Sequence, residues 1–266
     1  MKTRAITGFF FIIVLVLATV WNAYVFVAFF ALLGVLASRE FFEIVRSDET
    51  KPLLSLGLLA STVLAVLTGG YFLFDFQASY FLWSMLTSVL LFIASLYRRS
   101  PKPFHDIGYT LLGVVYGTLP FLFFIGLGFT SGAFVASIPM GFLIILWSND
   151  TGAYLTGRFF GRTKLFERIS PNKTWEGFIG GVLMALLISL SFPLFWSQGL
   201  SRVEWGIIAI IVGVFGTLGD LVESMLKRSL GIKDSGNILP GHGGILDRFD
   251  GLLVAAPLVY LFLTTL

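Results

Sequence analysis

Long apolar segments alternate with shorter polar segments along the 266-residue chain. Each apolar segment approaches the ~20 residues that a helix needs to cross the hydrocarbon core of a bilayer. Residues 5–37 contain no charged side chain, and only Trp21-Asn22 suggests a break between the first two apolar segments. The pattern predicts an all-α integral membrane protein with about nine transmembrane helices. The predicted segments are 5–20, 23–37, 53–68, 79–96, 107–128, 133–147, 177–196, 204–222 and 251–266.

The composition agrees with this class. Hydrophobic residues make up 56% of the chain and charged residues 12%, and the mean hydropathy is +0.90. A soluble domain carries about 25% charged residues. Lys2 and Arg4 precede an apolar run as in a signal peptide, but no small-residue cleavage site follows, so we expect a retained first span. The absence of cysteine excludes disulfides, thiolate metal sites and cysteine nucleophiles.

The Lys and Arg residues indicate how the spans are oriented. With nine spans and a cytoplasmic N-terminus, 17 of the 18 basic residues fall in inside segments, and only Arg202 falls outside. Cytoplasmic loops carry such an excess of basic residues. The chain is therefore predicted to have its N-terminus in the cytoplasm and its C-terminus outside. The inside residues are Lys2, Arg4, Arg39, Arg46, Lys51, Arg98, Arg99, Lys102, Arg158, Arg162, Lys164, Arg168, Lys173, Lys227, Arg228, Lys233 and Arg248.

Polar chemistry concentrates in the second half of the chain. Residues 1–140 are nearly pure span and short loop, and we interpret them as an N-terminal transmembrane scaffold. Residues 141–266 form the predicted C-terminal catalytic region. Its two long polar segments, 148–176 and 223–250, are both predicted cytoplasmic loops.

The eighth apolar segment ends in "GTLGDLVESMLKR". Asp220, Glu223 and Lys227 are spaced so that a helix presents them on one face. A carboxylate this close to the membrane is costly and usually functional. The alternative is an ordinary helix end with a surface pair of Asp and Lys. Glycines at 213, 216 and 219 permit close approach of another helix.

The second polar segment continues with "GHGG" and "DRFDG". Gly243 and Gly244 follow His242, and glycines let backbone N–H groups approach an anion. Asp247 and Asp250 lie one helical turn apart at the entrance to the ninth span. Clustered carboxylates suit Mg²⁺, whereas helix capping is the alternative role for each Asp.

The first polar segment contains "SNDTGAY" and "SPNKTWEG". Asn149 and Asp150 lie at the membrane edge, followed by Arg158. Ser170-Pro171 is predicted to start a helix, because proline is favoured at the first helical position. Lys173 and Glu176 then precede the seventh span. A basic loop on the cytoplasmic side is the alternative explanation for the charges.

Residues 224–250 resemble the full signature of the phosphatidate cytidylyltransferases, or CDP-diacylglycerol synthases, without departure, and "SNDTGAY" and "SPNKTWEG" also resemble family motifs. The matching residues are Ser224, Lys227, Arg228, Lys233, Asp234, Pro240, His242, Gly243, Gly244, Asp247, Arg248 and Asp250. Residues 1–140 carry little that is diagnostic.

The resemblance implies an enzyme that uses CTP, phosphatidic acid and Mg²⁺ to make CDP-diacylglycerol and pyrophosphate. The distribution of basic residues predicts that its active site lies at the cytoplasmic face of the cell membrane. Its partners would be these substrates and the bilayer, with no nucleic acid; a second cation and a homodimer stay open. A CTP-dependent lipid kinase and an ion-coupled transporter are the alternatives.

The site residues follow from the carboxylates and from the resemblance. The predicted catalytic residues are Asp220, Lys227, Asp247 and Asp250. The predicted metal ligands are Asp220, Asp247 and Asp250, with Glu223 and Asp150 as ligands or supporting residues. The predicted phosphate and substrate contacts are Lys227, Arg228 and Lys233, then Lys173 and Arg158, with Asn149, Asp150, His242, Gly243, Gly244 and Arg248.

Overall fold

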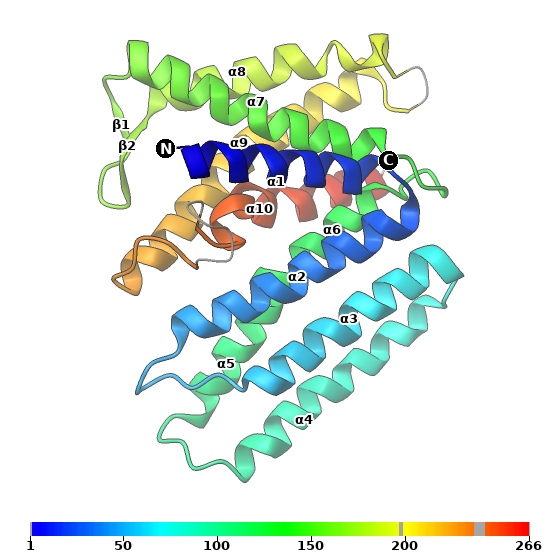
Figure 1. The fold of residues 1–266 in the computed structure, drawn as a ribbon, viewed down its shortest axis with the longest axis vertical. Helices are drawn as coiled ribbons and strands as arrows, with labels where there is room; N and C mark the ends of the chain where they lie inside the picture. The colour runs from blue at the N-terminus through cyan, green and yellow to red at the C-terminus, as the bar shows by residue number, and fades with distance from the viewer. Residues whose placement is uncertain (1, 197–198, 237–242, 266) are drawn as a thin grey trace. The chain divides into compact units, whose positions relative to one another are not determined.

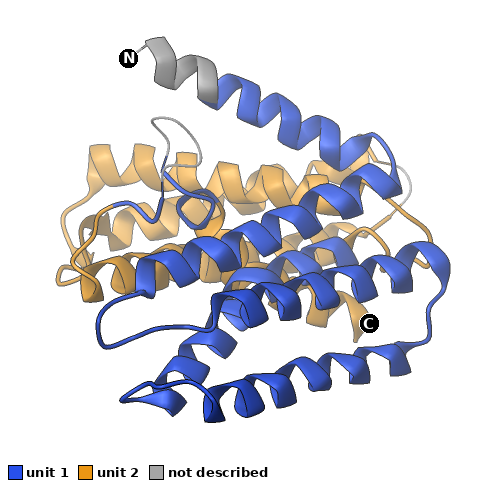
Figure 2. Ribbon diagram, turned by 60° about the horizontal axis from the view of Figure 1, so that its bottom comes forward, with its two compact units in different colours: residues 1–126, 234–248 blue, residues 127–233, 249–266 orange. Residues whose placement is uncertain are grey.

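The computed structural model describes residues 2–196, 199–236 and 243–265, with side chains from residue 8 onward. The chain forms two compact units (Figure 2). Unit 1 comprises Met1–Gly126 with Asp234–Arg248, and unit 2 comprises Leu127–Lys233 with Phe249–Leu266. Neither unit is continuous in sequence, because the short segment Asp234–Arg248 belongs to the same unit as the N-terminal half of the chain. The functional division at residue 140 stays a prediction.

Unit 1 is built from antiparallel helices joined by short turns (Figure 1). Asn22 caps the second helix by accepting a hydrogen bond from Val25 N at 2.9 Å, and this cap explains the break at Trp21-Asn22. Phe26 and Phe30 pack against Phe124 in the core, with ring centroids of Phe30 and Phe124 4.6 Å apart. The elements are α1 (Lys2–Val20), α2 (Ala23–Val45), α3 (Leu54–Phe74), η1 (Ala78–Trp83), α4 (Ser84–Leu96), α5 (Pro103–Gly113), η2 (Val114–Thr118) and α6 (Leu119–Leu127).

A single π-helical turn, η2, joins α5 to α6. Ser38 of α2 inserts its hydroxyl there, donating to Gly113 O at 2.8 Å and lying 2.7 Å from the hydroxyl of Thr118. A side chain that enters the helical hydrogen-bond ladder is a usual cause of such an irregularity. Gly117 permits the contact, because a Cβ atom there would lie 2.6 Å from Ser38 N.

Unit 2 holds the longest helix and a small hairpin. Helices α7 and α8 lie side by side (Figure 1), and glycines allow their close approach. A Cβ atom at Gly181, for example, would lie 2.7 Å from Asn149 O. The elements are α7 (Ser137–Phe160), β1 (Lys164–Phe166), β2 (Ser170–Thr174), α8 (Trp175–Ser189), η3 (Phe192–Leu194), α9 (Arg202–Ser229) and α10 (Leu246–Thr264).

The structure confirms an all-α membrane protein, with the antiparallel hairpin β1–β2 as its one described sheet. Each of the nine predicted apolar segments overlaps a helix among the described residues, although residues 133–136 and 190–191 lie outside helices. Within the residues that the structure describes, six helices are long and apolar enough to cross a membrane, and Gly8–Val20 is a shorter apolar helix. The count of nine spans goes beyond this finding.

Two local expectations require correction. Ser170-Pro171 does not start a helix, since both residues lie in β2 and α8 begins at Trp175, capped by Thr174. Proline is tolerated in β2 because a strand of a two-stranded sheet always has one edge without a partner. The polar segments are also shorter as loops than predicted, because α7 continues to Phe160 and α9 to Ser229.

Candidate active site

Unit 2 contains a cavity of about 540 Å³ lined by α7, the hairpin, α8 and α9. Five predicted site residues line it: Asn149, Asp150, Arg158, Lys173 and Asp220. Arg158 is exposed, and its Nη1 lies 3.1 Å from the hydroxyl of Tyr154, a further lining residue. The cavity therefore joins polar residues of the first predicted polar segment to Asp220, near the end of the eighth apolar segment.

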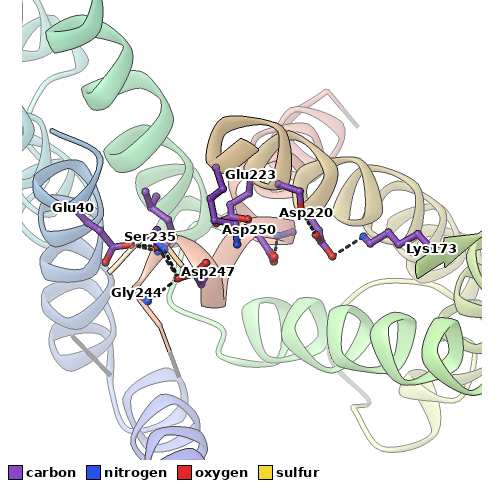
Figure 3. Close-up of polar contacts among 12 residues, drawn as sticks. Glu40, Lys173, Asp220, Glu223, Ser235, Gly244, Asp247 and Asp250 are labelled. Atoms are coloured by element: carbon purple, nitrogen blue, oxygen red, sulfur yellow. Dashed lines mark hydrogen bonds and ion pairs between the residues drawn. The ribbon is translucent and has the colours of Figure 1, made fainter. Parts of the chain in front are cut away.

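The end of the hairpin positions Lys173. The next residue, Thr174, is the N-cap of α8 and accepts a hydrogen bond from Gly177 N at 3.1 Å. Glu176 in the first turn of α8 accepts from Arg162 N at 3.1 Å and from Thr163 N at 3.2 Å, so that both ends of the hairpin are held. The ammonium group of Lys173 pairs with Asp220 Oδ2 at 2.5 Å (Figure 3).

Three carboxylates lie within electrostatic reach of this ammonium group, and one of them, Asp220, contacts it. Asp150 comes from α7, Asp220 from α9 and Asp250 from the first turns of α10, and the charge of Asp220 acts on both of the others. Lys173 offsets part of the repulsion, since its charge also acts on Asp150 and Asp250. Gly219 allows α10 to approach α9, because a Cβ atom there would lie 2.4 Å from Asp250 O.

The carboxylates fit a hard divalent cation that binds together with a phosphate. Among the described residues, no group of three or more His, Cys, Asp or Glu side chains is close enough to hold a metal ion by itself. Mg²⁺ does not need such a group, because it usually takes one or two carboxylates and completes its shell with water and substrate phosphates. An added cation would also reduce the electrostatic repulsion among Asp150, Asp220 and Asp250.

Asn149 of α7 is buried and contacts α9. Its Nδ2 donates to Thr217 Oγ1 at 3.3 Å, and that hydroxyl donates to Gly213 O at 2.9 Å. Thr217 also lines the cavity. Thr217 was not among the predicted site residues, because one Thr in an apolar helix carries no signal of its own.

The remaining predicted residues of α9 lie beyond the cavity lining. Lys227 pairs with Glu223 at 2.7 Å, with side chains 17% and 2% exposed. Both partners of this ion pair are thus largely buried. A buried ion pair needs good geometry to offset the loss of hydration of its two charges. Arg228 and Lys233 are exposed.

Asp247 lies in unit 1 within a set of hydrogen bonds (Figure 3). Its Oδ2 accepts from Ser235 N, Ser235 Oγ and Gly244 N, each at 2.8 Å. Gly243 has a φ of 77°, and a Cβ atom there would lie 2.5 Å from Asp247 Oδ2. Arg248 is exposed, whereas His242 lies outside the described residues.

Glu40 of α2 contacts the same segment and was missed by the sequence analysis. Its carboxylate accepts hydrogen bonds from Ser235 Oγ, Ile245 N and Leu246 N (Figure 3). It is 2% exposed, within a helix that is apolar enough to cross a membrane. An acidic residue inside such a helix is the signal that could have found it.

Comparisons with known proteins give one consistent result. The Cytidylyltransferase family matches residues 2–266. The phosphatidate cytidylyltransferase of Bacillus subtilis (strain 168) is 35% identical over 266 residues, which are 99% of this chain and 97% of the relative. That of Staphylococcus haemolyticus is 33% identical over 264 residues, 99% of both chains. That of Staphylococcus aureus (strain COL) is 45% identical over 162 residues, 60% of each chain.

Proposed function

The chain belongs to the phosphatidate cytidylyltransferase family, and we propose that it transfers the cytidylyl group of CTP to phosphatidic acid. A phosphate oxygen of phosphatidic acid attacks the α-phosphorus of CTP, and the bond from that phosphorus to the pyrophosphate oxygen breaks. The products are CDP-diacylglycerol and pyrophosphate. The single observation that carries this proposal is the family match over essentially the whole chain.

The cavity in unit 2 supports the proposal because it supplies the charges that the reaction needs. Both substrates are anions, so cationic groups must offset their repulsion and the charge that develops on the leaving pyrophosphate. Lys173 and Arg158 line the cavity and are the groups that we assign to phosphate binding there. Asn149 and Asp150 also line the cavity and would orient the bound substrate.

We assign metal binding to the carboxylates. Asp220 and Asp250 would hold Mg²⁺ jointly with the substrate phosphates, with Asp247, Glu223 and Asp150 as further ligands or supporting residues. The bound ion would neutralise phosphate charge and polarise the reacting phosphoryl group. Lys173 competes for the same oxygens of Asp220 at 2.5 Å, so its ammonium group would turn toward phosphate when the cation binds.

Four basic residues beyond the cavity complete the assignment. Lys227, Arg228, Lys233 and Arg248 would contact the triphosphate or the lipid phosphate. His242, Gly243 and Gly244 belong to the same proposed substrate-binding segment. A second cation and a homodimer stay predictions.

The membrane arrangement is proposed as nine spans, with a cytoplasmic N-terminus, a C-terminus outside and the active site on the cytoplasmic face of the cell membrane. The overlap of each segment with a helix and the distribution of basic residues support it. At that face soluble CTP would meet a phosphate that the bilayer holds in place, which lowers the entropic cost of bringing the two together.

The test is a transfer assay with purified protein in detergent or lipid. CTP labelled in the α-phosphate should yield labelled lipid, and CTP labelled in the γ-phosphate should yield labelled pyrophosphate. Label from the γ-phosphate in lipid would indicate a CTP-dependent lipid kinase instead. Folded protein that turns over no nucleotide would favour the ion-coupled transporter.

Two controls sharpen this assay. Diacylglycerol should not replace phosphatidic acid, because it lacks the attacking phosphate oxygen. Chelation of Mg²⁺ should stop the reaction, because two polyanions repel each other without a compensating charge. Transfer to diacylglycerol would contradict the proposed reaction.

A further inference from the structure

Glu40 is a buried acidic residue that the proposed reaction does not use directly. It lies on α2, in a segment that is otherwise suited to cross a membrane, and is 2% exposed. A carboxylate without hydrogen-bond partners would be strongly unfavourable there. A carboxylate at this buried position therefore needs hydrogen-bond donors around it.

Those partners come from the start of α10. Ile245 N donates to Glu40 Oε2 at 2.8 Å, and Leu246 N donates to Glu40 Oε1 at 3.0 Å. Because α10 begins at Leu246, these N–H groups belong to the helix end that has no acceptors within the helix. Glu40 of α2 thus caps the N-terminus of α10, although the two helices are far apart in the sequence. The dipole of α10 also favours a negative charge at this end.

Ser235 links Glu40 to Asp247. Its hydroxyl contacts Glu40 Oε1 and also lies 2.8 Å from Asp247 Oδ2, and its backbone N–H donates to the same Asp247 oxygen at 2.8 Å. A serine hydroxyl has one hydrogen, so it is shared between two carboxylates. The orientation of Asp247 therefore depends on where Glu40 holds Ser235.

The glycines of this segment leave space for the two carboxylates. A Cβ atom at Gly244 would lie 2.0 Å from Glu40 Oε1, and one at Gly243 would lie 2.5 Å from Asp247 Oδ2. Gly244 N also donates to Asp247. The Gly-Gly pair therefore accommodates carboxylates of the protein itself in this structure.

We propose that Glu40 is a positioning residue, whose carboxylate caps the first turn of α10 and, through Ser235, orients Asp247. This inference rests on the proposed function, in which Asp247 serves the metal site. Glu40 acts only through these neighbours and needs no contact with substrate.

The test compares Glu40→Gln and Ser235→Ala with Glu43→Gln. Glu43 lies on the same helix but is exposed and pairs with Arg39 at 2.8 Å, so it is a matched control. Glutamine keeps the size of the side chain and one acceptor oxygen, which protects the fold. Glu40→Ala is the harsher variant and is used only if it extracts as folded protein.

Two measurements decide the outcome. Hydrogen exchange of peptides covering residues 243–250 should become at least about tenfold faster in Glu40→Gln, because the capped N–H groups lose a charged acceptor. The Mg²⁺ concentration for half-maximal turnover should rise about tenfold in Glu40→Gln and less in Ser235→Ala. Glu43→Gln should match the wild type in both.

Unchanged exchange and unchanged Mg²⁺ dependence in Glu40→Gln would overturn the inference. Faster exchange with wild-type Mg²⁺ dependence would reduce Glu40 to a purely structural cap and would also overturn it. If the wild type itself forms no cytidine-containing lipid, the proposed function fails, whereas the exchange measurement still decides whether Glu40 caps α10.

Discussion

The ammonium group of Lys173, near the end of β2, lies 2.5 Å from a carboxylate oxygen of Asp220 on α9. This pair joins the first polar segment of the sequence to the end of the eighth apolar segment in one cavity. The charge of Lys173 also acts on Asp150 and Asp250, so one cation serves three carboxylates. Such a balance is easily shifted by a bound cation or phosphate.

Replacing Lys173 should therefore impair catalysis more than folding. We expect Lys173→Gln to lower kcat/KM for CTP by at least about a hundredfold, because a preorganised cation facing the phosphates is lost. Lys173→Arg should retain part of the activity. The control is Lys164→Gln, since Lys164 lies on the same hairpin and its ammonium group donates to Pro171 O at 2.6 Å. Equal activity of both glutamine variants would contradict the assigned role.

The acidic residues should show a metal-dependent loss. Asp220→Asn, Asp247→Asn and Asp250→Asn should each lower turnover at limiting Mg²⁺ by at least about a hundredfold, because each removes a charged oxygen assigned to the metal site. The measurement is pyrophosphate release across a Mg²⁺ titration. Asp48→Asn, at an exposed turn, should behave as the wild type. Near-normal activity of Asp247→Asn and Asp250→Asn would leave helix capping as their role.

Gly244 should not tolerate a side chain. In Gly244→Ala the new Cβ atom would lie 2.0 Å from Glu40 Oε1, so the loop or α2 must shift. Such overpacking costs about 1–3 kcal/mol, and we expect a lower Tm in detergent together with lost turnover.

Gly108→Ala is the matched control for this substitution. Gly108 lies within α5 with nothing within 4 Å of a Cβ atom, so alanine should raise stability by about 0.5–1 kcal/mol. A Gly244→Ala variant as stable and active as Gly108→Ala would show that the segment is loosely packed.

The proposed topology can be tested by cysteine labelling, because the natural chain contains no cysteine. Single cysteines at the exposed positions Ser131 and Arg202 should react with a membrane-impermeant reagent added outside intact cells. Cysteines at Asp48 and Ser229, which are also exposed, should react only after the cells are opened. Labelling of Ser229 from outside would contradict a cytoplasmic active site.

Most of the helical architecture could be predicted from the sequence because the signal is local. An apolar run of sufficient length must form internal backbone hydrogen bonds in a membrane, and this constraint favours helices without reference to neighbours. Each of the nine predicted segments overlaps a helix among the described residues. The hairpin was missed, since Pro171 suits both a helix start and an edge strand, and only the pairing of Lys164 with Thr174 and of Phe166 with Ser170 distinguishes them.

The candidate site was predicted as a set of residues rather than as an arrangement. The acidic and basic residues of the two polar segments could be named from their charge and spacing, because charged groups are costly beside a membrane and are retained for function. Which of them meet depends on helix packing. Glycines at 213, 216 and 219 indicated close approach, yet only the structure places Asn149 beside Thr217 on α9.

By itself the sequence determined the membrane class, the helical segments and the residues that carry charge, because each of these depends on neighbours within one or two helical turns. Only the tertiary structure decided that Lys173 pairs with Asp220 and that Glu40 caps α10. Glu40 and Ile245 are 205 residues apart. No local pattern encodes such a contact, because it forms only when packed helices bring a buried acceptor to the free N–H groups of another helix end.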